Sequence, residues 1–209
     1  MNLADLKRAV GSMDIYLLDQ LVRGRIDEGS RIFDAGCGSG RNLKWFLEAG
    51  HPVGGVDQDP SAIDKVRALA ARGAHVAPEN SFRVEAIESN TFEDRSWDVV
   101  ISSAVLHFAR DHEHFKAMLE GSWRLLADGG LFFCRLASRI GMSEERFHPL
   151  GSGRYAMPDG SDRYLVDEDL LMALTRKLGG ELLDPIKTTV VQDQRCMTTW
   201  VLRKAGAGS

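Results

Sequence analysis

The hydrophobic positions of this chain recur with two different spacings, and their alternation predicts an α/β domain. Short apolar runs bounded by turn residues predict strands over residues 31–34, 53–56, 81–85, 97–102 and 130–135. Apolar residues at helical spacing predict the intervening helices, over about 43–49, 60–72 and 115–126. Because strands that alternate with helices pair in parallel, we expect one mostly parallel sheet with helices on both faces.

The two ends of the chain depart from this rhythm. Residues 1–28 carry apolar side chains at helical spacing and predict an N-terminal helical cap. Residues 137–166 are rich in glycine, proline and arginine, so they predict an irregular cover over the active site. A last helix over 166–178 precedes two apolar segments, 181–191 and 196–204, which predict a C-terminal β-hairpin.

Length and charge narrow the class of protein. The 209 residues suit one domain over 1–204, with 205–209 as a disordered tail. The formal charge of −4 argues against nucleic acid as a partner, because binding to phosphate backbones needs a clustered basic face. No apolar run approaches the roughly 18 residues that span a bilayer, and the N-terminus lacks a signal-peptide core. We expect a cytoplasmic monomer or homodimer without membrane contact.

The cysteines and histidines do not predict a metal site. Cys37, Cys134 and Cys196 are odd in number and widely spaced, which indicates reduced thiols. His112 and His114 have acidic neighbours, but a two-residue spacing at a helix start splays them, so solvated charge is the better interpretation. We therefore expect no metal ion.

One segment carries a nucleotide-binding pattern. The first strand ends at Asp34, a loop with Gly36, Gly38 and Gly40 follows, and a helix begins directly after it. Glycines allow a ligand to approach the loop backbone, although a plain tight turn would need them too. The second strand ends in Asp57, where a carboxylate can accept hydrogen bonds from both ribose hydroxyls.

The spacing of the glycines selects among nucleotides. A dinucleotide fingerprint has a Gly-x-Gly-x-x-Gly spacing, whereas these glycines alternate strictly and follow a carboxylate that would repel a pyrophosphate. Asp34 instead suits a positively charged ligand, such as the ammonium of an amino acid, or it caps loop amides. With this loop and Asp57, the chain resembles the class I S-adenosylmethionine-dependent methyltransferases. The loop ending Gly40-Arg-Asn42 is similar to small tellurite-resistance and thiopurine-type members.

The resemblance implies a fold and a cofactor site. The implied fold is a single Rossmann-like, doubly wound sheet of seven strands, mostly parallel, with an antiparallel C-terminal hairpin. The implied cofactor is S-adenosylmethionine, with S-adenosylhomocysteine as the product. The expected cofactor-binding residues are Tyr16, Asp34, Gly36, Cys37, Gly38, Gly40, Asn42, Asp57, Gln58, Glu85, Ala86 and Ser103. Structural alternatives stay open for three of these residues. Tyr16 could be a partly buried aromatic of the helix, Cys37 a small residue that fills space in the loop, and Glu85 a solvated acid.

Two residues are candidates for the reaction itself. His107 follows the fourth strand and is placed to accept a proton from the methyl acceptor, although a structural role is an alternative. Arg135 ends the fifth strand and, with Arg154 and Arg163, would hold an anionic acceptor unless all three are surface arginines.

The function predicted from these features is methyl transfer in line from S-adenosylmethionine to a small-molecule acceptor. Alignment of the reacting atoms supplies most of the catalysis in such a transfer, so a missing catalytic triad does not argue against an enzyme. Two alternatives remain at this point: a non-catalytic protein that binds S-adenosylmethionine or S-adenosylhomocysteine, and an NAD-dependent oxidoreductase. The glycine spacing and the terminal hairpin disfavour the second alternative.

Overall fold

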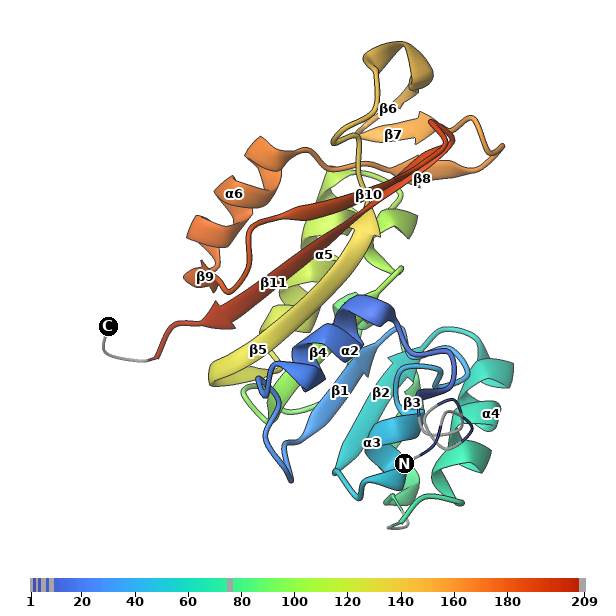
Figure 1. Cartoon of the computed structure of the whole chain (residues 1–209), viewed down its shortest axis with the longest axis vertical. Coiled ribbons are helices and arrows are strands. Elements are labelled where there is room, and N and C mark those ends of the chain that lie inside the picture. Colours follow the sequence, from blue (N-terminus) through green and yellow to red (C-terminus); the bar gives the residue numbers. More distant parts are fainter. Residues whose placement is uncertain (1, 3, 5–6, 8–9, 75–76, 207–209) are drawn as a thin grey trace.

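The computed structural model describes residues 2, 4, 7, 10–74 and 77–206 of the chain. Figure 1 shows one twisted central sheet with helices on both sides and a smaller sheet above one end of it. Most of the predicted cap before residue 10, and residues 207–209 of the predicted tail, lie outside the described residues.

The central sheet contains eight strands among the described residues, in the order β10-β11-β5-β4-β1-β2-β3, with β9 pairing with β11. Strands β1 to β5 pair in parallel, and β11 is antiparallel to β5. This arrangement confirms the predicted α/β class with its antiparallel end. The strands are β1 (Ile32–Ala35), β2 (Val53–Asp57), β3 (Phe82–Val84), β4 (Trp97–Ser103), β5 (Leu126–Ala137), β9 (Gly180–Leu182), β10 (Lys187–Val191) and β11 (Arg195–Lys204).

Helices cover both faces of this sheet. One face is covered by α2 (Ile15–Val22), α3 (Lys44–Glu48) and α4 (Pro60–Ala70), and the other by α5 (His112–Trp123) and α6 (Glu168–Lys177). Successive strand residues point to opposite faces, so each strand contributes to two cores. In β1, Ile32 packs with α2 to α4, whereas Phe33 packs with the core that contains α5 and α6.

Four short 3-10 turns lie between these elements in the described part of the chain. They are η1 (Glu79–Ser81), η2 (Ile87–Ser89), η3 (Leu106–Phe108) and η4 (Glu144–Arg146). Helix α4 begins as predicted, because the Asp59 carboxylate accepts a hydrogen bond from the Ser61 N–H and Pro60 occupies the first turn.

Helix α5 and strand β5 differ from their predicted bounds. The helix begins at His112 because Asp111 accepts a hydrogen bond from the His114 N–H. It ends at Trp123, so the glycines at 129 and 130 do not terminate it. They lie inside β5, where the pairing register with β4 shifts between Trp97 and Val99.

The predicted strand over 181–191 is two strands. The chain leaves the sheet between β9 and β10, at Asp184 and Pro185. The Asp184 carboxylate accepts hydrogen bonds from Gln20 at 3.3 Å and Arg25 at 2.6 Å, which hold this segment against α2 and its following turn. Pro185 has no N–H to donate to a ladder, so the interruption follows from both residues.

Residues 137–166 were expected to be irregular, and this expectation was wrong for their second half. They contain a three-stranded antiparallel sheet of β6 (His148–Gly151), β7 (Arg154–Ala156) and β8 (Asp162–Tyr164). The chain reverses between β6 and β7 through three residues with positive φ, 151–153. A separate small core that includes Met142, Phe147 and Met157 supports this sheet, which lies beyond the end of β5 (Figure 1).

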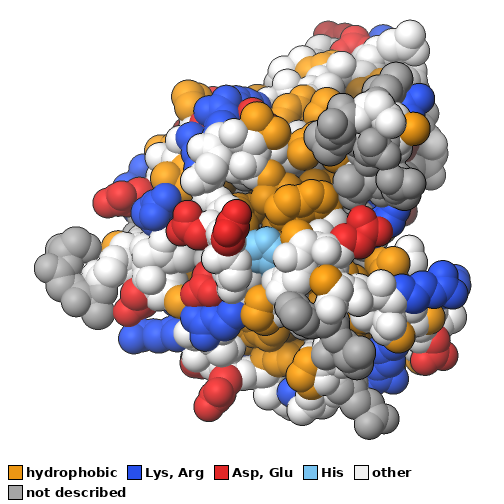
Figure 2. All heavy atoms as spheres, turned by 60° about the horizontal axis from the view of Figure 1, so that its bottom comes forward, with side chains coloured by type: hydrophobic (Ala, Val, Ile, Leu, Met, Phe, Trp, Pro, Cys, Tyr) orange, Lys and Arg blue, Asp and Glu red, His pale blue; other side chains and the backbone are white. Residues whose placement is uncertain are grey.

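Charged side chains of both signs are interspersed on the face of the molecule that Figure 2 shows. Within the described part of the chain, no helix is long and apolar enough to cross a membrane. The same described residues contain no group of three or more His, Cys, Asp or Glu side chains placed to hold a metal ion.

Candidate functional site

The glycine loop runs from the end of β1 to α3 and is fixed to the end of β2. The N–H groups of Gly36 and Cys37 both donate to the Val56 carbonyl at 2.9 Å. The Gly38 N–H donates to Asp57 Oδ2 at 2.8 Å. The loop and the ribose-binding candidate Asp57 are therefore in direct contact at the same edge of the sheet.

The three glycines are needed for different reasons. All have positive φ, at 87°, 51° and 82° for Gly36, Gly38 and Gly40. A Cβ on Gly36 would lie 2.5 Å from Val105, and one on Gly40 would lie 2.7 Å from Val66. A Cβ on Gly38 would meet no atom within 4 Å. Protein packing thus excludes a side chain at Gly36 and Gly40, whereas at Gly38 the positive φ is the remaining constraint.

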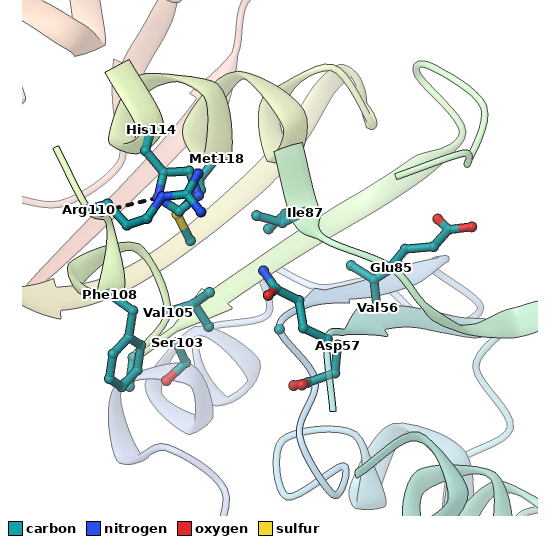
Figure 3. A pocket seen from close by; sticks show the side chains of 13 residues that line it. Val56, Asp57, Glu85, Ile87, Ser103, Val105, Phe108, Arg110, His114 and Met118 are labelled. Atoms are coloured by element: carbon teal, nitrogen blue, oxygen red, sulfur yellow. Dashed lines mark hydrogen bonds between the residues drawn. The ribbon is translucent and has the colours of Figure 1, made fainter. Parts of the chain in front are cut away.

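A cavity of about 450 Å³ opens at the carboxyl ends of β1 to β4 (Figure 3). In Figure 3, Asp57 lies on one side of it, and Val105 and Ser103 lie across from it. It contains five of the predicted cofactor residues. The lining residues are Gly36, Val56, Asp57, Gln58, Glu85, Ile87, Ser103, Ala104, Val105, Phe108, Arg110, His114 and Met118.

Asp57 keeps free acceptor capacity in this cavity. Its Oδ2 accepts from the Gly38 N–H, and its Oδ1 accepts from the Asp59 N–H at 3.0 Å. An ionised carboxylate accepts about four hydrogen bonds. Each oxygen can therefore still accept one more bond, which fits a vicinal diol such as a ribose.

Asp34 is buried beneath the loop, with 2% of its surface exposed. Its Oδ1 has no hydrogen-bond partner among the described residues. Burial raises the pKa of Asp34 to about 8, and Asp57 adds to the rise while Arg41 opposes it. Buried polar atoms are nearly always paired, so the lone oxygen indicates a missing cationic or hydrogen-bonding partner.

Several residues expected at the cofactor do not line the cavity. Tyr16 shares a hydrogen bond with Thr189 of β10, so it ties α2 to the hairpin. The Asn42 Oδ1 accepts from the Asp14 N–H at 3.0 Å, which is a contact within the protein. Cys37, whose burial raises the pKa of its thiol, is a packed loop residue. Asp34, Gly38, Gly40 and Ala86 are also absent from the wall.

Glu85 contributes to the wall, but its carboxylate is occupied. It accepts hydrogen bonds from the Thr91 N–H at 2.8 Å and the Thr91 hydroxyl at 2.6 Å. In Figure 3 the carboxylate points away from Asp57. Its role in this structure is therefore to fix the loop after β3.

The sequence interpretation missed the part of the wall that comes from η3 and α5. His114, expected to be solvated, faces the cavity; its Nδ1 accepts from the Arg110 N–H, and its Nε2 lies 3.0 Å from Glu88. Phe108 and Met118 add apolar surface to the same side. No short motif marks these residues, because only the return of α5 beside η2 brings them together.

Asp14 is a further polar centre that the sequence did not indicate. It is 4% exposed and caps α2 by accepting from the Tyr16 N–H. Its Oδ2 accepts hydrogen bonds from the Ser103 hydroxyl at 3.2 Å and from Arg135 Nη1 at 3.1 Å. Asp14 therefore links the cap helix to the ends of both β4 and β5.

A second cavity of about 270 Å³ adjoins the first and shares Ala104 with it. It brings together both predicted reaction residues, His107 and Arg135, and also Arg163; Arg154, the other arginine considered, is not in its wall. Its lining residues are Ala104, His107, Arg135, Ala137, Met157, Asp159, Ser161, Arg163, Val191, Arg195, Cys196 and Met197.

His107 has no free basic nitrogen in this arrangement. Its Nδ1 accepts a hydrogen bond from the Ala137 N–H at 3.1 Å, so the neutral ring carries its proton on Nε2. Burial lowers the pKa of His107 to about 4, with a smaller contribution from Arg163. At neutral pH the side chain is a hydrogen-bond donor, and this geometry favours the structural alternative over proton acceptance.

Comparison with known proteins agrees with this geometry. Residues 33–134 match the family model described as a methyltransferase domain, a range that contains the glycine loop, Asp57 and most of the first cavity. This matched segment, just under half of the chain, belongs to the class I S-adenosylmethionine-dependent methyltransferases. The cofactor of this family is S-adenosylmethionine, which confirms the cofactor predicted from the loop.

Solved methyltransferase structures share the fold at low sequence identity. A methyltransferase from Methanosarcina mazei superposes with a TM-score of 0.73 at 20% identity, covering 89% of this chain and 97% of its own. The 1,6-didemethyltoxoflavin-N1-methyltransferase of Burkholderia thailandensis, solved with 1,6-didemethyltoxoflavin and S-adenosylhomocysteine, has a TM-score of 0.69 at 19% identity, covering 97% and 82%. At such identities these structures show the fold alone.

One curated relative has a named reaction, and this chain matches part of its length. The chain is 26% identical over 172 residues to a ubiquinone biosynthesis O-methyltransferase of Chelativorans sp., covering 76% of this chain and 64% of that protein. Across the curated relatives reported to match, the chain spans between 33% and 64% of their length.

Proposed function

We propose that this methyltransferase binds S-adenosylmethionine in the first cavity and transfers its methyl group to a small-molecule acceptor in the second. The observation that carries the proposal is that the two cavities adjoin at Ala104. One wall holds the diol-binding candidate Asp57, and the other holds Arg135 and His107. Donor and acceptor molecules would therefore meet within one connected site.

The residues that line the first cavity, and Asp34 and Gly38 in the adjoining loop region, fit the cofactor. Asp57 retains two acceptor positions for the ribose hydroxyls, and the lone Oδ1 of Asp34 suits the methionine ammonium. The apolar side chains of Val56, Ile87 and Met118 suit the flat face of an adenine. Gly38 leaves space for a ligand against the loop.

The chain contributes alignment and exclusion of water more than proton transfer. When bound, S-adenosylmethionine would supply a methyl group on a positively charged sulfur, which would leave with the bonding electron pair as the acceptor takes the methyl group. Val105 lines the first cavity and Met157 the second, and their apolar surface favours exclusion of water once both ligands are bound. Because His107 donates from Nε2, the acceptor has to arrive deprotonated or release its proton to solvent.

Small acceptors are favoured by the size of the second cavity, about 270 Å³, and by its position beside β8 and the turn that precedes it. The small-molecule acceptor bound to the Burkholderia enzyme and the reaction named for the Chelativorans relative support the same class. We place residues 137–166 as the cover of the acceptor site, because Met157, Ser161 and Arg163 come from this segment.

Calorimetric titration with S-adenosylmethionine and S-adenosylhomocysteine, with NAD as control, tests the cofactor assignment. We expect micromolar affinity for the first two ligands and no binding of NAD. Binding of NAD instead would overturn the proposal. Turnover of S-adenosylmethionine with any small acceptor then separates an enzyme from a protein that only binds the cofactor.

A further inference from the structure

We infer that the second cavity receives the acceptor as an anion, a small flat molecule whose carboxylate is held by Arg135, Arg163 and Arg195. This inference rests on the proposed function, because it names the class of acceptor for the same site. Three guanidinium groups and a single carboxylate, that of Asp159, line the cavity. Its wall is therefore strongly basic although the whole chain carries a net charge of −4.

The one acid of the cavity is already engaged by its own turn. Asp159 Oδ1 accepts hydrogen bonds from the Ser161 N–H at 3.1 Å and from the Ser161 hydroxyl at 2.5 Å. These bonds lower the pKa of Asp159, with smaller contributions from Arg163 and Arg195. The carboxylate stabilises the turn before β8 and does not form an ion pair with either arginine.

Two of the three arginines form no ion pair among the described residues. Within the described residues, Arg163 and Arg195 have no carboxylate within 4.0 Å. Arg163 donates one hydrogen bond, from Nη1 to the Asp162 carbonyl at 2.7 Å, so most of its donors remain available. A guanidinium presents paired N–H groups whose geometry matches a carboxylate.

Arg135 is held in place with one donor unused. Its Nη1 donates to Asp14, and its guanidinium carbon lies 5.3 Å from the centre of the Tyr16 ring. Its Nε is buried and has no partner among the described residues. An unpaired buried donor beside a cavity indicates an acceptor that a ligand supplies. Asp14 is thus a positioning residue for this arginine.

The rest of the wall favours a flat, partly apolar body. Met157, Met197 and Val191 add apolar surface to the wall that contains the arginines. At the border with the first cavity, the Arg163 guanidinium carbon lies 4.8 Å from the centre of the Phe108 ring. A planar acid can lie against the apolar surface while its carboxylate faces the guanidinium groups.

Matched acids and amides test this inference on the intact chain. Protein saturated with S-adenosylhomocysteine is titrated calorimetrically with salicylate and salicylamide, and with quinaldate and quinaldamide. We expect each acid to bind about tenfold or more tightly than its amide, since a hydrogen bond to a charged group contributes roughly 1.5–3 kcal/mol. The Arg163→Gln and Arg195→Gln variants should each weaken acid binding about tenfold and leave amide binding unchanged.

The controls separate this inference from the proposed function. Arg176→Gln removes the same charge from an exposed position on α6 and should change none of the affinities. Equal binding of acids and amides, no binding of any acid at millimolar concentration, or unchanged acid binding in both arginine variants would overturn the anionic acceptor. Failure of S-adenosylhomocysteine itself to bind would instead overturn the proposed function. Thermal melts confirm that the variants are folded.

Discussion

The two cavities of this protein differ in how the chain builds them. The first is formed at the ends of four neighbouring strands, β1 to β4, with one side closed by η3 and α5. The second is assembled from four segments that are far apart in the sequence, around residues 104–107, 135–137, 157–163 and 191–197. A local motif therefore marks the first cavity, whereas tertiary contacts alone create the second.

The cavities also differ in the sign of their charge. Asp57, Glu85 and Arg110 line the first cavity, so its acids outnumber its arginine, whereas Arg135, Arg163 and Arg195 line the second beside one acid, Asp159. In our proposal, a cationic cofactor and an anionic acceptor each meet side chains of the opposite sign. The difference teaches that one small site can hold two oppositely charged ligands when separate parts of the chain supply the two walls.

Removal of Asp57 should have the largest effect and should be confined to the cofactor side. Asp57→Ala deletes both ribose acceptors and frees the Gly38 N–H, so we expect affinity for S-adenosylhomocysteine to fall about a hundredfold or more. Calorimetry measures this loss. Asp59→Ala is the matched control: it removes the α4 cap and should cost about 1 kcal/mol of stability with little loss of affinity. Near-unchanged binding in Asp57→Ala would refute the ribose assignment.

Substitution of Gly38 by alanine should mainly lower cofactor affinity, whereas the same substitution at Gly36 should mainly lower the stability of the fold. Gly38→Ala places a Cβ in open space, and we expect about a tenfold loss of cofactor affinity with a modest drop in melting temperature. Gly36→Ala drives a Cβ into Val105 and should instead cost stability, about 1–3 kcal/mol. Thermal melts and titrations of both variants, run side by side, give the comparison. The same profile for both would contradict the distinct roles.

Replacement of Asp34 should change how the stability of the protein depends on pH. The pKa of Asp34 is about 8 in the folded protein and 3.8 in an ordinary environment. Between these values the unfolded chain loses a proton that the folded protein keeps, so this carboxyl lowers stability as pH rises from about 4 to about 8. We expect Asp34→Asn to melt several degrees higher than the wild type at neutral pH, with the difference vanishing toward pH of about 4.

Ligand binding should reverse that penalty. A cationic group beside Asp34 favours the ionised carboxylate, so cofactor binding at neutral pH should release a proton. Titrations in two buffers with different ionisation enthalpies measure the release, and Asp34→Asn should abolish it and weaken binding. A wild-type titration whose heat does not depend on the buffer would argue against an ammonium at Asp34.

His107 should give the smallest effect, on the acceptor side. Its pKa of about 4 lies below the ordinary 6.5, so the unfolded chain takes up a proton first and stability falls as pH drops from about 6.5 toward 4. NMR titration of the ring should show no midpoint above pH of about 5. His107→Asn, whose side-chain oxygen can accept from the Ala137 N–H, should cost about 1 kcal/mol or less. A midpoint near 6.5 would restore His107 as a candidate base.

The fold was predictable in its parallel half because each element there carries its own local signal. Apolar runs marked β1, β2 and β4, and Asp59-Pro60 marked the start of α4. Predictions were less accurate where side chains from a distant segment decide the local path of the backbone. The break at Asp184 depends on Gln20 and Arg25, and no local pattern reveals such partners.

By itself, the sequence determined the order of strands and helices from β1 to β5, the glycine loop, and the place of Asp57 at the end of β2. These features depend on residues close together in the chain or on backbone conformations that glycine permits. Only the tertiary structure decided that neighbouring side chains exclude a Cβ at Gly36 and Gly40. It also decided that His107 accepts a hydrogen bond from a backbone N–H and that Arg195 and Arg135 line the same cavity. The physical reason is that a cavity and its charge depend on side chains from distant segments, which only the folded chain brings together.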